Sequence, residues 1–97
     1  MNMKDILTVQ IFTVSGQQPP MECDDVLLPI SDCVSGAFSG SYGIRPGHAP
    51  AVFSLKAGLL QLSFQGKRIY EANVSDGFAT VENNELCITV ESASPIV

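Results

Sequence analysis

The sequence has 97 residues, of which 45% are hydrophobic, and its mean hydropathy is +0.24. These values exclude an intrinsically disordered chain and fit one domain spanning 1–97. Ten acidic and five basic residues give a net charge of −5, which disfavours a nucleic-acid partner because an acidic surface repels phosphate. Charged residues make up only 15% of the chain, which is typical of a small domain that covers part of its surface with a partner.

The sequence predicts a cytosolic chain with free thiols. No apolar run reaches the roughly 18 residues that span a bilayer, and the start at Met1 has neither the apolar core nor the cleavage site of a leader. Cys23, Cys33 and Cys87 are odd in number and widely spaced. We therefore predict buried or half-buried free cysteines and no disulfide framework.

Apolar and polar residues alternate along most of the chain, which is the period of a β-strand. The first predicted strand, 8–14, is rich in β-branched residues. A short second strand, 26–28, is predicted to stop at Pro29. Further strands are predicted at 51–55, 60–65, 67–74, 78–81 and 86–90. We find no amphipathic helical pattern, internal repeat or linker.

Turn-forming residues separate these strands. Gln65-Gly66 predicts a hairpin, and Asn83-Asn84 predicts a two-residue loop because Asn tolerates left-handed backbone geometry. Ser75-Asp76-Gly77 predicts a turn in which the glycine takes a positive φ. Short strands with turns at this spacing predict an all-β fold, either an antiparallel sandwich or a barrel.

One stretch breaks the pattern. Residues 33–47 are dominated by Ser and Gly, with aromatic and apolar residues interleaved, and they predict a long loop that carries function. The stretch leads into a rigid bend, Pro46-Gly47-His48-Ala49-Pro50. There the prolines fix φ and remove backbone donors, while Gly47 permits a sharp reversal.

The residues suggest no catalytic site. His48 is the only histidine, and as a general base it would need Ser35, Ser39 or Ser41 as the nucleophile. No G-x-S-x-G turn surrounds any of these serines. We expect instead that the ring of His48 fills space and donates a hydrogen bond to a backbone carbonyl.

A metal or cofactor site is equally poorly supported. Zinc needs three or four ligands, whereas Cys23, Asp24 and Asp25 are adjacent on a predicted strand and point to alternate faces. The same alternation argues against the two aspartates as an acid–base pair. Three more candidates, Cys33, His48 and Cys87, would meet only through tertiary folding. We therefore expect no metal and no cofactor.

Phosphate binding is not predicted either. A P-loop requires a lysine and a following helix after its glycines, and both are missing after Gly36, Gly40 and Gly43. The pair Lys67-Arg68 is too short to form a basic patch. The residues alone therefore favour a binding or structural role.

The bend also carries a resemblance. Residues 43–50, Gly-Ile-Arg-Pro-Gly-His-Ala-Pro, resemble the G-[IV]-x-P-[GN]-H-A-P signature of the epsilon subunit of F-type ATP synthases, which is the delta subunit in mitochondria. Other segments follow in that family's order and spacing. They are 7–15, Val26-Leu27-Leu28-Pro29, Leu55-x-x-Gly58, Ser75-x-Gly77-Phe78-Ala79-x-Val81 and Asn84-x-Leu86-x-Ile88.

The resemblance implies a flattened antiparallel β-sandwich of two sheets, with no active site, in the central stalk of a rotary motor. Its implied partners are the gamma subunit and the c ring, and its implied role is to couple ion translocation to ATP synthesis. It would then be a peripheral part of the complex on the cytoplasmic side of the bacterial plasma membrane. Two alternatives are a generic β-sandwich interaction module with another partner and, less favoured, a small hydrolase using His48.

By motif position, the resemblance implies five partner-contact residues: Ser41, Tyr42, Ile44, Arg45 and His48. Tyr42 suits a contact anchor because its ring is amphipathic, and it equally suits an aromatic lid on one end of the core. His48 is expected to fix the bend. Ser41 stands where relatives commonly carry an acidic residue.

Two departures from the family pattern stand out. The stretch 33–39 looks like an insertion, which would alter docking onto the ring. The sequence ends at Ser94-Pro95-Ile96-Val97, where most relatives continue into an inhibitory helical hairpin. We therefore expect no C-terminal α-hairpin, no self-inhibition and no ATP site in these residues.

Overall fold

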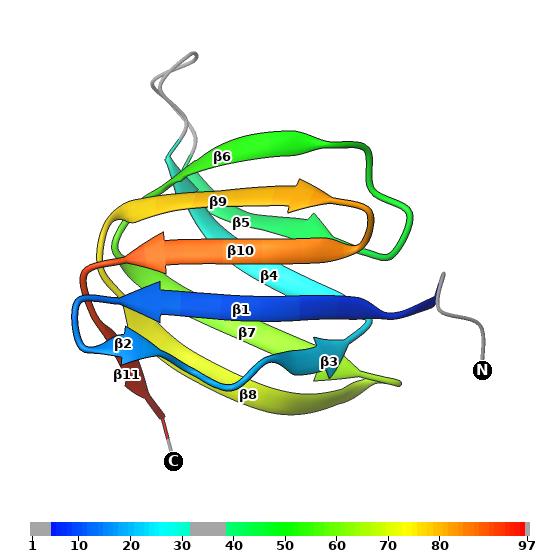
Figure 1. Ribbon diagram of the computed structural model, residues 1–97, viewed down its shortest axis with the longest axis horizontal. Helices are drawn as coiled ribbons and strands as arrows, with labels where there is room; N and C mark the ends of the chain where they lie inside the picture. The colour runs from blue at the N-terminus through cyan, green and yellow to red at the C-terminus, as the bar shows by residue number, and fades with distance from the viewer. Residues whose placement is uncertain (1–4, 32–38, 97) are drawn as a thin grey trace.

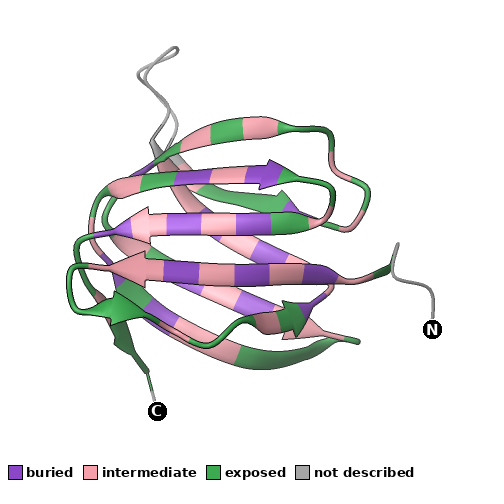
Figure 2. Cartoon of the chain, in the orientation of Figure 1, coloured by how far each residue is buried: buried purple, intermediate pink, exposed green. Residues whose placement is uncertain are grey.

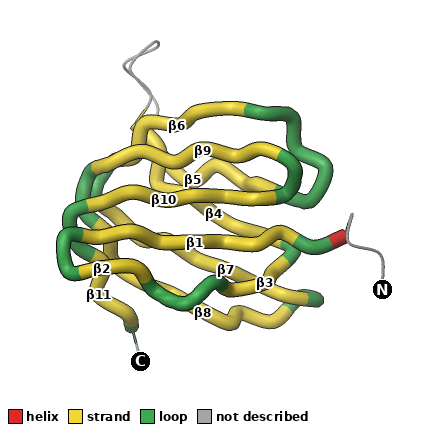
Figure 3. Tube along the Cα trace, in the orientation of Figure 1, coloured by secondary structure: helices red, strands yellow, loops and turns green. Residues whose placement is uncertain are grey.

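Strands make up the fold of the computed structural model, which describes residues 5–31 and 39–96, and one helical position, Asp5, precedes them (Figure 3). Eleven strands follow one another along the described chain. They are β1 (Leu7–Thr13), β2 (Gly16–Gln17), β3 (Met21–Cys23), β4 (Asp25–Ser31), β5 (Ser39–Ile44), β6 (Ala51–Leu55), β7 (Gly58–Phe64), β8 (Lys67–Val74), β9 (Gly77–Glu82), β10 (Glu85–Val90) and β11 (Ala93–Pro95).

The strands form one curled, hydrogen-bonded path in the order β11-β8-β7-β4-β6-β9-β10-β1-β2, with β3 on β1 and β5 on β4. The path folds over so that β6, β9, β10 and β1 form one layer and β5, β4, β7 and β8 form the other (Figure 1). Strand β4 joins the layers, because it pairs with β7 through Leu27 and with β6 through Ile30. The predicted all-β sandwich is confirmed.

The core is the space between the two layers, and it is filled by the inward residues of each alternating strand (Figure 2). No polar or charged residue is buried in the described part of the chain. The buried residues are Leu7, Val9, Ile11, Cys23, Val26, Leu28, Ile44, Leu55, Leu60, Leu62, Ala72, Val74, Ala79, Val81, Leu86, Ile88 and Val90. The alternation in the sequence therefore identified Leu60, Leu62, Leu86, Ile88 and Val90 as core-facing correctly, whereas Phe64 is only half-buried.

The pairing is not entirely antiparallel as expected. Strand β1 pairs parallel to β10, with Val9 beside Leu86 and Ile11 beside Ile88. The pair brings together a strand from the start of the domain and one that begins only at Glu85. Alternation within each strand is the same in both pairing modes, so the sequence pattern does not distinguish them.

The prediction that the second strand stops at Pro29 is wrong, because β4 continues to Ser31. Pro29 lacks an N–H, yet its carbonyl oxygen accepts a hydrogen bond from the backbone N–H of Lys56 at 2.9 Å. The backbone polar groups of Pro29 therefore face β6, at the point where β7 no longer pairs with β4. The missing donor costs no bond to β5, so the strand passes through the proline.

The prediction of a loop throughout 33–47 is also wrong in part. Ser39–Ile44 forms strand β5, which pairs with β4 in a continuous register from Ser39 beside Ser31 to Ile44 beside Val26. Pairing with β4 and burial of Ile44 outweigh the low strand propensity of the glycines. The expected insertion otherwise lies outside the described residues, as do Cys33, Ser35 and Gly36. The short strands β2, β3 and β11 were not predicted.

The two predicted hairpin turns are confirmed. Gln65 and Gly66 have φ values of 52° and 82°, and Asn83 and Asn84 have values of 52° and 61°. Gly77 differs from its prediction, because it is not among the residues with positive φ. A Cβ atom there would lie 2.1 Å from the carbonyl oxygen of Thr89. Gly77 is therefore needed for the close approach of β10 and not for a turn conformation.

Candidate partner-binding end of the sandwich

The rigid bend connects β5 to β6 at one end of the sandwich and is held at two points. The backbone N–H of His48 donates to the carbonyl oxygen of Arg45 at 3.2 Å. Gly47, with a φ of 90°, donates its backbone N–H to Oδ1 of Asn84 at 2.8 Å. The second bond ties the bend to the turn between β9 and β10, so this end of the molecule is one braced unit.

Both ring nitrogens of His48 lie within hydrogen-bond distance of a partner, which fixes the orientation of the ring. Nδ1 lies 2.7 Å from the carbonyl oxygen of Ala49, and because a carbonyl only accepts, Nδ1 carries the hydrogen. Nε2 of the neutral ring is then an acceptor, and it lies 3.2 Å from the hydroxyl of Tyr42. The expected bond from the ring to a backbone carbonyl is confirmed. Nε2 faces Tyr42, which leaves the hydrolase alternative without a histidine–serine pair in the described structure.

Three rings cluster beside the bend. The centroid of Tyr42 lies 5.0 Å from that of Phe53, and the ring of His48 lies 5.9 Å from each of them. Tyr42 is 39% exposed, whereas its neighbour on the same face of β5, Ile44, is fully buried. The tyrosine therefore covers one end of the core and presents the rest of its surface to solvent, so both roles foreseen for it fit its position.

The other predicted contact residues differ in accessibility. Ser41 is exposed, and the side chain of Arg45 is 79% exposed with its Nε 4.0 Å from Oδ1 of Asp25. An ion pair this open contributes little to stability, so the guanidinium can bind elsewhere. Ile44 is a correction, because it is fully buried opposite Val26 and its side chain offers no surface to a partner.

A hollow of about 570 Å³ lies between the bend and the turn at 83–84. Two carboxylates, from Glu22 and Glu85, contribute to its lining together with the ring of His48, and its lining residues include no lysine or arginine. The sequence analysis did not predict this hollow. Its walls come from distant segments that the pairing of β1 with β3 and β10, the pairing of β6 with β9 and the bond from Gly47 to Asn84 bring together.

The outer face of the β6–β9–β10–β1 layer carries few charges. Its central row consists of Val52, Thr80, Cys87 and Gln10, which lie side by side on successive strands. Val52 is 73% exposed, and the next row includes Phe78, which is 50% exposed. The sequence could have predicted this weakly charged face, because Val52 and Phe78 are apolar residues at the outward positions of predicted strands.

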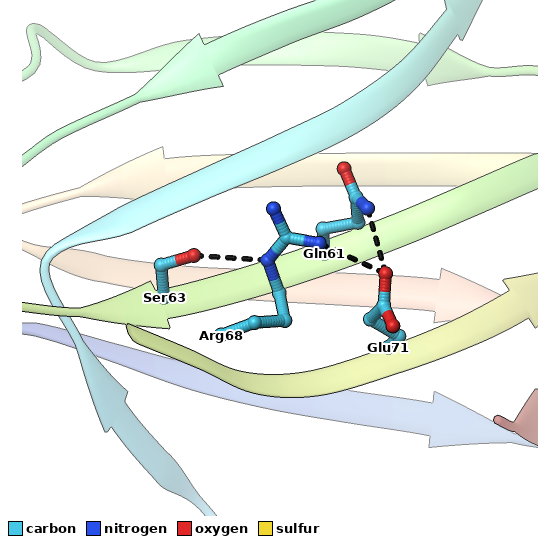
Figure 4. Close-up of polar contacts among 4 residues, drawn as sticks. All are labelled: Gln61, Ser63, Arg68 and Glu71. Atoms are coloured by element: carbon cyan, nitrogen blue, oxygen red, sulfur yellow. Dashed lines mark hydrogen bonds and ion pairs between the residues drawn. The ribbon is translucent and has the colours of Figure 1, made fainter. Parts of the chain in front are cut away.

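Part of the outer face of the opposite layer is polar. On β7 and β8, Nη1 of Arg68 lies 2.8 Å from Oε2 of Glu71, and its Nε donates to the hydroxyl of Ser63 at 3.0 Å (Figure 4). The side-chain amide of Gln61 donates to the same Glu71 oxygen at 2.7 Å. The charge of Arg68 is thus matched within the cluster.

The remaining candidates for chemistry stay apart. Cys23 is buried and Cys87 half-buried, both as free thiols, which confirms that expectation for these two. Burial raises the pKa of the Cys23 thiol to about 11, so it is protonated at neutral pH.

Among residues 5–31 and 39–96, no three His, Cys, Asp or Glu side chains gather as a metal site. The same part of the chain contains no helix long and apolar enough to cross a membrane.

Residues 25–96 match the model of the family described as "ATP synthase, Delta/Epsilon chain, beta-sandwich domain". The ATP synthase epsilon chain of Staphylococcus saprophyticus is 39% identical over 92% of this chain, and that of Synechococcus sp. (strain JA-2-3B'a(2-13)) is 38% identical over 90%. The epsilon chain of Desulfitobacterium hafniense is 28% identical over 96%. The chain spans 61%, 58% and 64% of the lengths of these relatives, respectively.

Two solved structures share the fold. A chain of the Euglena gracilis mitochondrial ATP synthase, in a structure of OSCP, F1 and the c-ring, superimposes with a TM-score of 0.80 and 18% identity. The match covers 98% of this chain and 56% of that one. A chain of the Tetrahymena thermophila central stalk and c-ring gives 0.69 at 15% identity, covering 90% and 64%. From the family match over 25–96 and the curated relatives, the chain belongs to the delta/epsilon family of ATP synthase subunits, as its β-sandwich domain.

Proposed function

We propose that this chain is a non-catalytic rotor subunit of the central stalk of an F-type ATP synthase. In this role it binds the gamma subunit and the c ring and couples ion translocation to ATP synthesis. The observation that carries the proposal is the braced bend at 46–50, which lies within the segment 43–50 that resembles the family signature and stands at one end of the sandwich. The solved relatives support it, since they come from assemblies that contain the central stalk or c-ring.

A part that transmits torque must resist bending, and the fold meets this requirement. The core of the described residues is entirely apolar and is enclosed by two layers that are joined through β4. Close-packed interiors of this kind have low compressibility. The bend is fixed to a second turn by Asn84, so a load applied at this end passes into β9 and β10 as well as β5 and β6.

The predicted partner-contact residues that are accessible to solvent determine which groups the proposed contact area offers to a partner. Arg45 supplies an exposed cation, Tyr42 supplies a partly exposed ring, and Ser41 supplies an exposed hydroxyl. His48 orients Tyr42 and the bend. An area of this kind suits a protein surface that offers a carboxylate beside an apolar patch. The proposed location is the cytoplasmic side of a bacterial plasma membrane, as a peripheral part of the complex.

The proposal is tested by assembly and coupling. The chain, carrying an affinity tag, is expressed with the other subunits of its own synthase, and the purified complex is assayed for gamma, for the c ring and for ATP-driven ion pumping in vesicles. We expect both partners to co-purify and pumping to depend on the chain. A chain that purifies without gamma and leaves pumping unchanged would support the alternative of a generic interaction module.

A charge-reversal pair then tests the contact area. Arg45→Glu is expected to weaken assembly, because it places a carboxylate at the proposed contact. Lys56→Glu makes the same charge change after β6, at the opposite end of that strand from the bend, and is expected to assemble normally. Equal assembly of the two variants would remove Arg45 from the proposed interface.

A further inference from the structure

The outer edge of β5 has no partner strand among residues 5–31 and 39–96, where β5 pairs with β4 alone (Figure 1). We propose that this edge is a strand-addition site, at which an extended segment of a protein partner hydrogen-bonds to the β5 backbone. The partner segment belongs to a neighbouring stalk protein, so the inference rests on the proposed function. It goes beyond that function by assigning a binding mode to one strand edge.

The position of Pro29 identifies which backbone groups of β5 point outwards. The carbonyl of Pro29 is bonded to Lys56, so the backbone polar groups of Pro29 face away from β5. In an antiparallel pair, opposite residues either exchange both hydrogen bonds or exchange none. Pro29 lies opposite Ser41, which makes this a non-bonded pair. The N–H and C=O groups of Ser41 therefore point to the open edge, and those of Gly43, two residues on, do the same.

The edge lacks the features that normally block strand addition. Proteins protect sheet edges with very short strands, prolines, lysines or bulges. Among the other strands with open edges, β2 has two residues, β3 has three, and β11 has three with Pro95 among them, whereas β6 has five residues and pairs with β4 only at Leu55. β5 has six residues, Ser-Gly-Ser-Tyr-Gly-Ile, with no proline and no charge, and its register with β4 is unbroken.

The flanking side chains define the partner segment. Tyr42 lies on the inner face of β5, and its ring is packed on Phe53 but is 39% exposed. An added strand would place a side chain directly beside this ring, and an apolar one fits there. Arg45 follows the strand with its guanidinium open to solvent. The segment is therefore an extended peptide with an apolar residue opposite Tyr42 and a carboxylate near Arg45.

A matched pair of substitutions at Ser41 tests the inference. Ser41→Pro removes only an N–H that points to the open edge, so the bonds between β5 and β4 are kept. Ser41→Ala removes the hydroxyl and keeps that N–H. Both variants are expected to fold, which is checked by circular dichroism and thermal unfolding. In assembly with gamma and the c ring, Ser41→Pro is expected to bind about tenfold more weakly than Ser41→Ala, and the difference between Ser41→Ala and wild type measures the contribution of the hydroxyl separately.

Amide hydrogen exchange of the wild-type chain gives a second readout that needs no variant. In the free chain, the amides of Ser41 and Gly43 are expected to exchange fast, and that of Tyr42, bonded to β4, is expected to exchange slowly. In the assembled complex all three should exchange slowly. If Ser41→Pro fails to fold, protection of Ser41 and Gly43 on assembly still decides the question.

The outcomes separate the two proposals. Assembly of wild-type chain without protection of Ser41 and Gly43, with equal binding of Ser41→Pro and Ser41→Ala, overturns the strand-addition site and leaves the proposed function standing. Failure of the wild-type chain to assemble overturns both. Protection of these amides in the free chain that rises with its concentration shows pairing with a second copy, which also overturns the inference.

Discussion

The hydroxyl of Tyr42 lies 3.2 Å from Nε2 of His48, and the opposite nitrogen of the same ring lies 2.7 Å from the carbonyl oxygen of Ala49. A tyrosine on β5 and a carbonyl in the bend thus select one tautomer of the histidine between them. The ring serves as a structural brace. This accounts for a histidine between two prolines in a protein for which we propose no catalysis.

Replacing Tyr42 by Phe is expected to lower the free energy of unfolding by about 1 kcal/mol, because it removes one hydrogen bond and keeps the ring contact with Phe53. Urea denaturation measures this change. The 15N chemical shift of His48 Nε2 should also change, because this nitrogen loses its hydrogen-bond donor. Tyr70→Phe is the control, because the Tyr70 hydroxyl bonds to Gln18. An identical His48 spectrum in both variants would contradict the hydrogen bond between Tyr42 and His48.

Asn84→Gly is expected to detach the bend without breaking the turn. Glycine accepts the φ of 61° found at this position, but it cannot offer the oxygen that bonds the N–H of Gly47 at 2.8 Å. We expect a loss of about 1 kcal/mol and faster exchange of the Gly47 amide. Asn83→Gly, at a φ of 52°, should leave the Gly47 amide as protected as in wild type. Equal protection in both variants would show that the Asn84 side chain does not hold the bend.

Gly77→Ala is expected to destabilise the domain by more than about 2 kcal/mol. The new Cβ would lie 2.1 Å from the carbonyl oxygen of Thr89 and 2.8 Å from Cγ1 of Val90, so β9 and β10 would have to separate. Gly43→Ala is the control, because its Cβ would meet only Cδ2 of Leu27, at an ordinary 3.9 Å. Thermal unfolding compares the two. A similar melting temperature for both variants would argue against a close approach at Gly77.

Stability is expected to fall above pH 9 because of Cys23. Burial raises the pKa of this thiol from 9.0 to about 11; a backbone hydrogen bond from Asp25 opposes the rise, and the carboxylates of Asp24 and Asp25 add to it. The unfolded chain therefore loses this proton at lower pH than the folded one. The contribution of Cys23 is complete below pH 9.0 and is lost as the pH rises towards 11, by no more than about 3 kcal/mol.

Urea denaturation between pH 8 and 11 measures this effect in a chain whose other two cysteines are replaced by serine, so that Cys23 is its only thiol. Cys23→Ala in that background should abolish the Cys23 component of the pH dependence. A parallel decline in both proteins would mean that other groups cause the loss.

The core and the hairpins could be predicted from the sequence because they depend on local signals. Alternation at Leu60, Leu62 and Phe64 identifies a strand with one inward face, and Asn83-Asn84 identifies its kind of turn wherever it occurs. The bend was predictable for the same reason, since proline and glycine restrict or free their own backbone angles.

The features that were missed depend on distant partners. Pro29 ends a strand in most contexts. Here it does not, because the N–H of Lys56 donates to its carbonyl oxygen and no neighbouring strand requires an N–H at this position. The glycines of β5 disfavour a strand, yet β4 supplies the pairing. The link from Gly47 to Asn84 and the ring contact between Tyr42 and Phe53 join residues far apart in sequence. No local pattern records such contacts.

The parallel pairing of β1 with β10 also constrains how the molecule is made. As the chain leaves the ribosome, β1 appears among the first residues, but the strand beside it in the finished sheet begins only at Glu85. Until then, the backbone N–H and C=O groups on that side of β1 can hydrogen-bond only to solvent or to a chaperone. Closure of the domain therefore waits until β10 has been synthesised, and the rate of translation between β1 and β10 sets how long that side of β1 stays open.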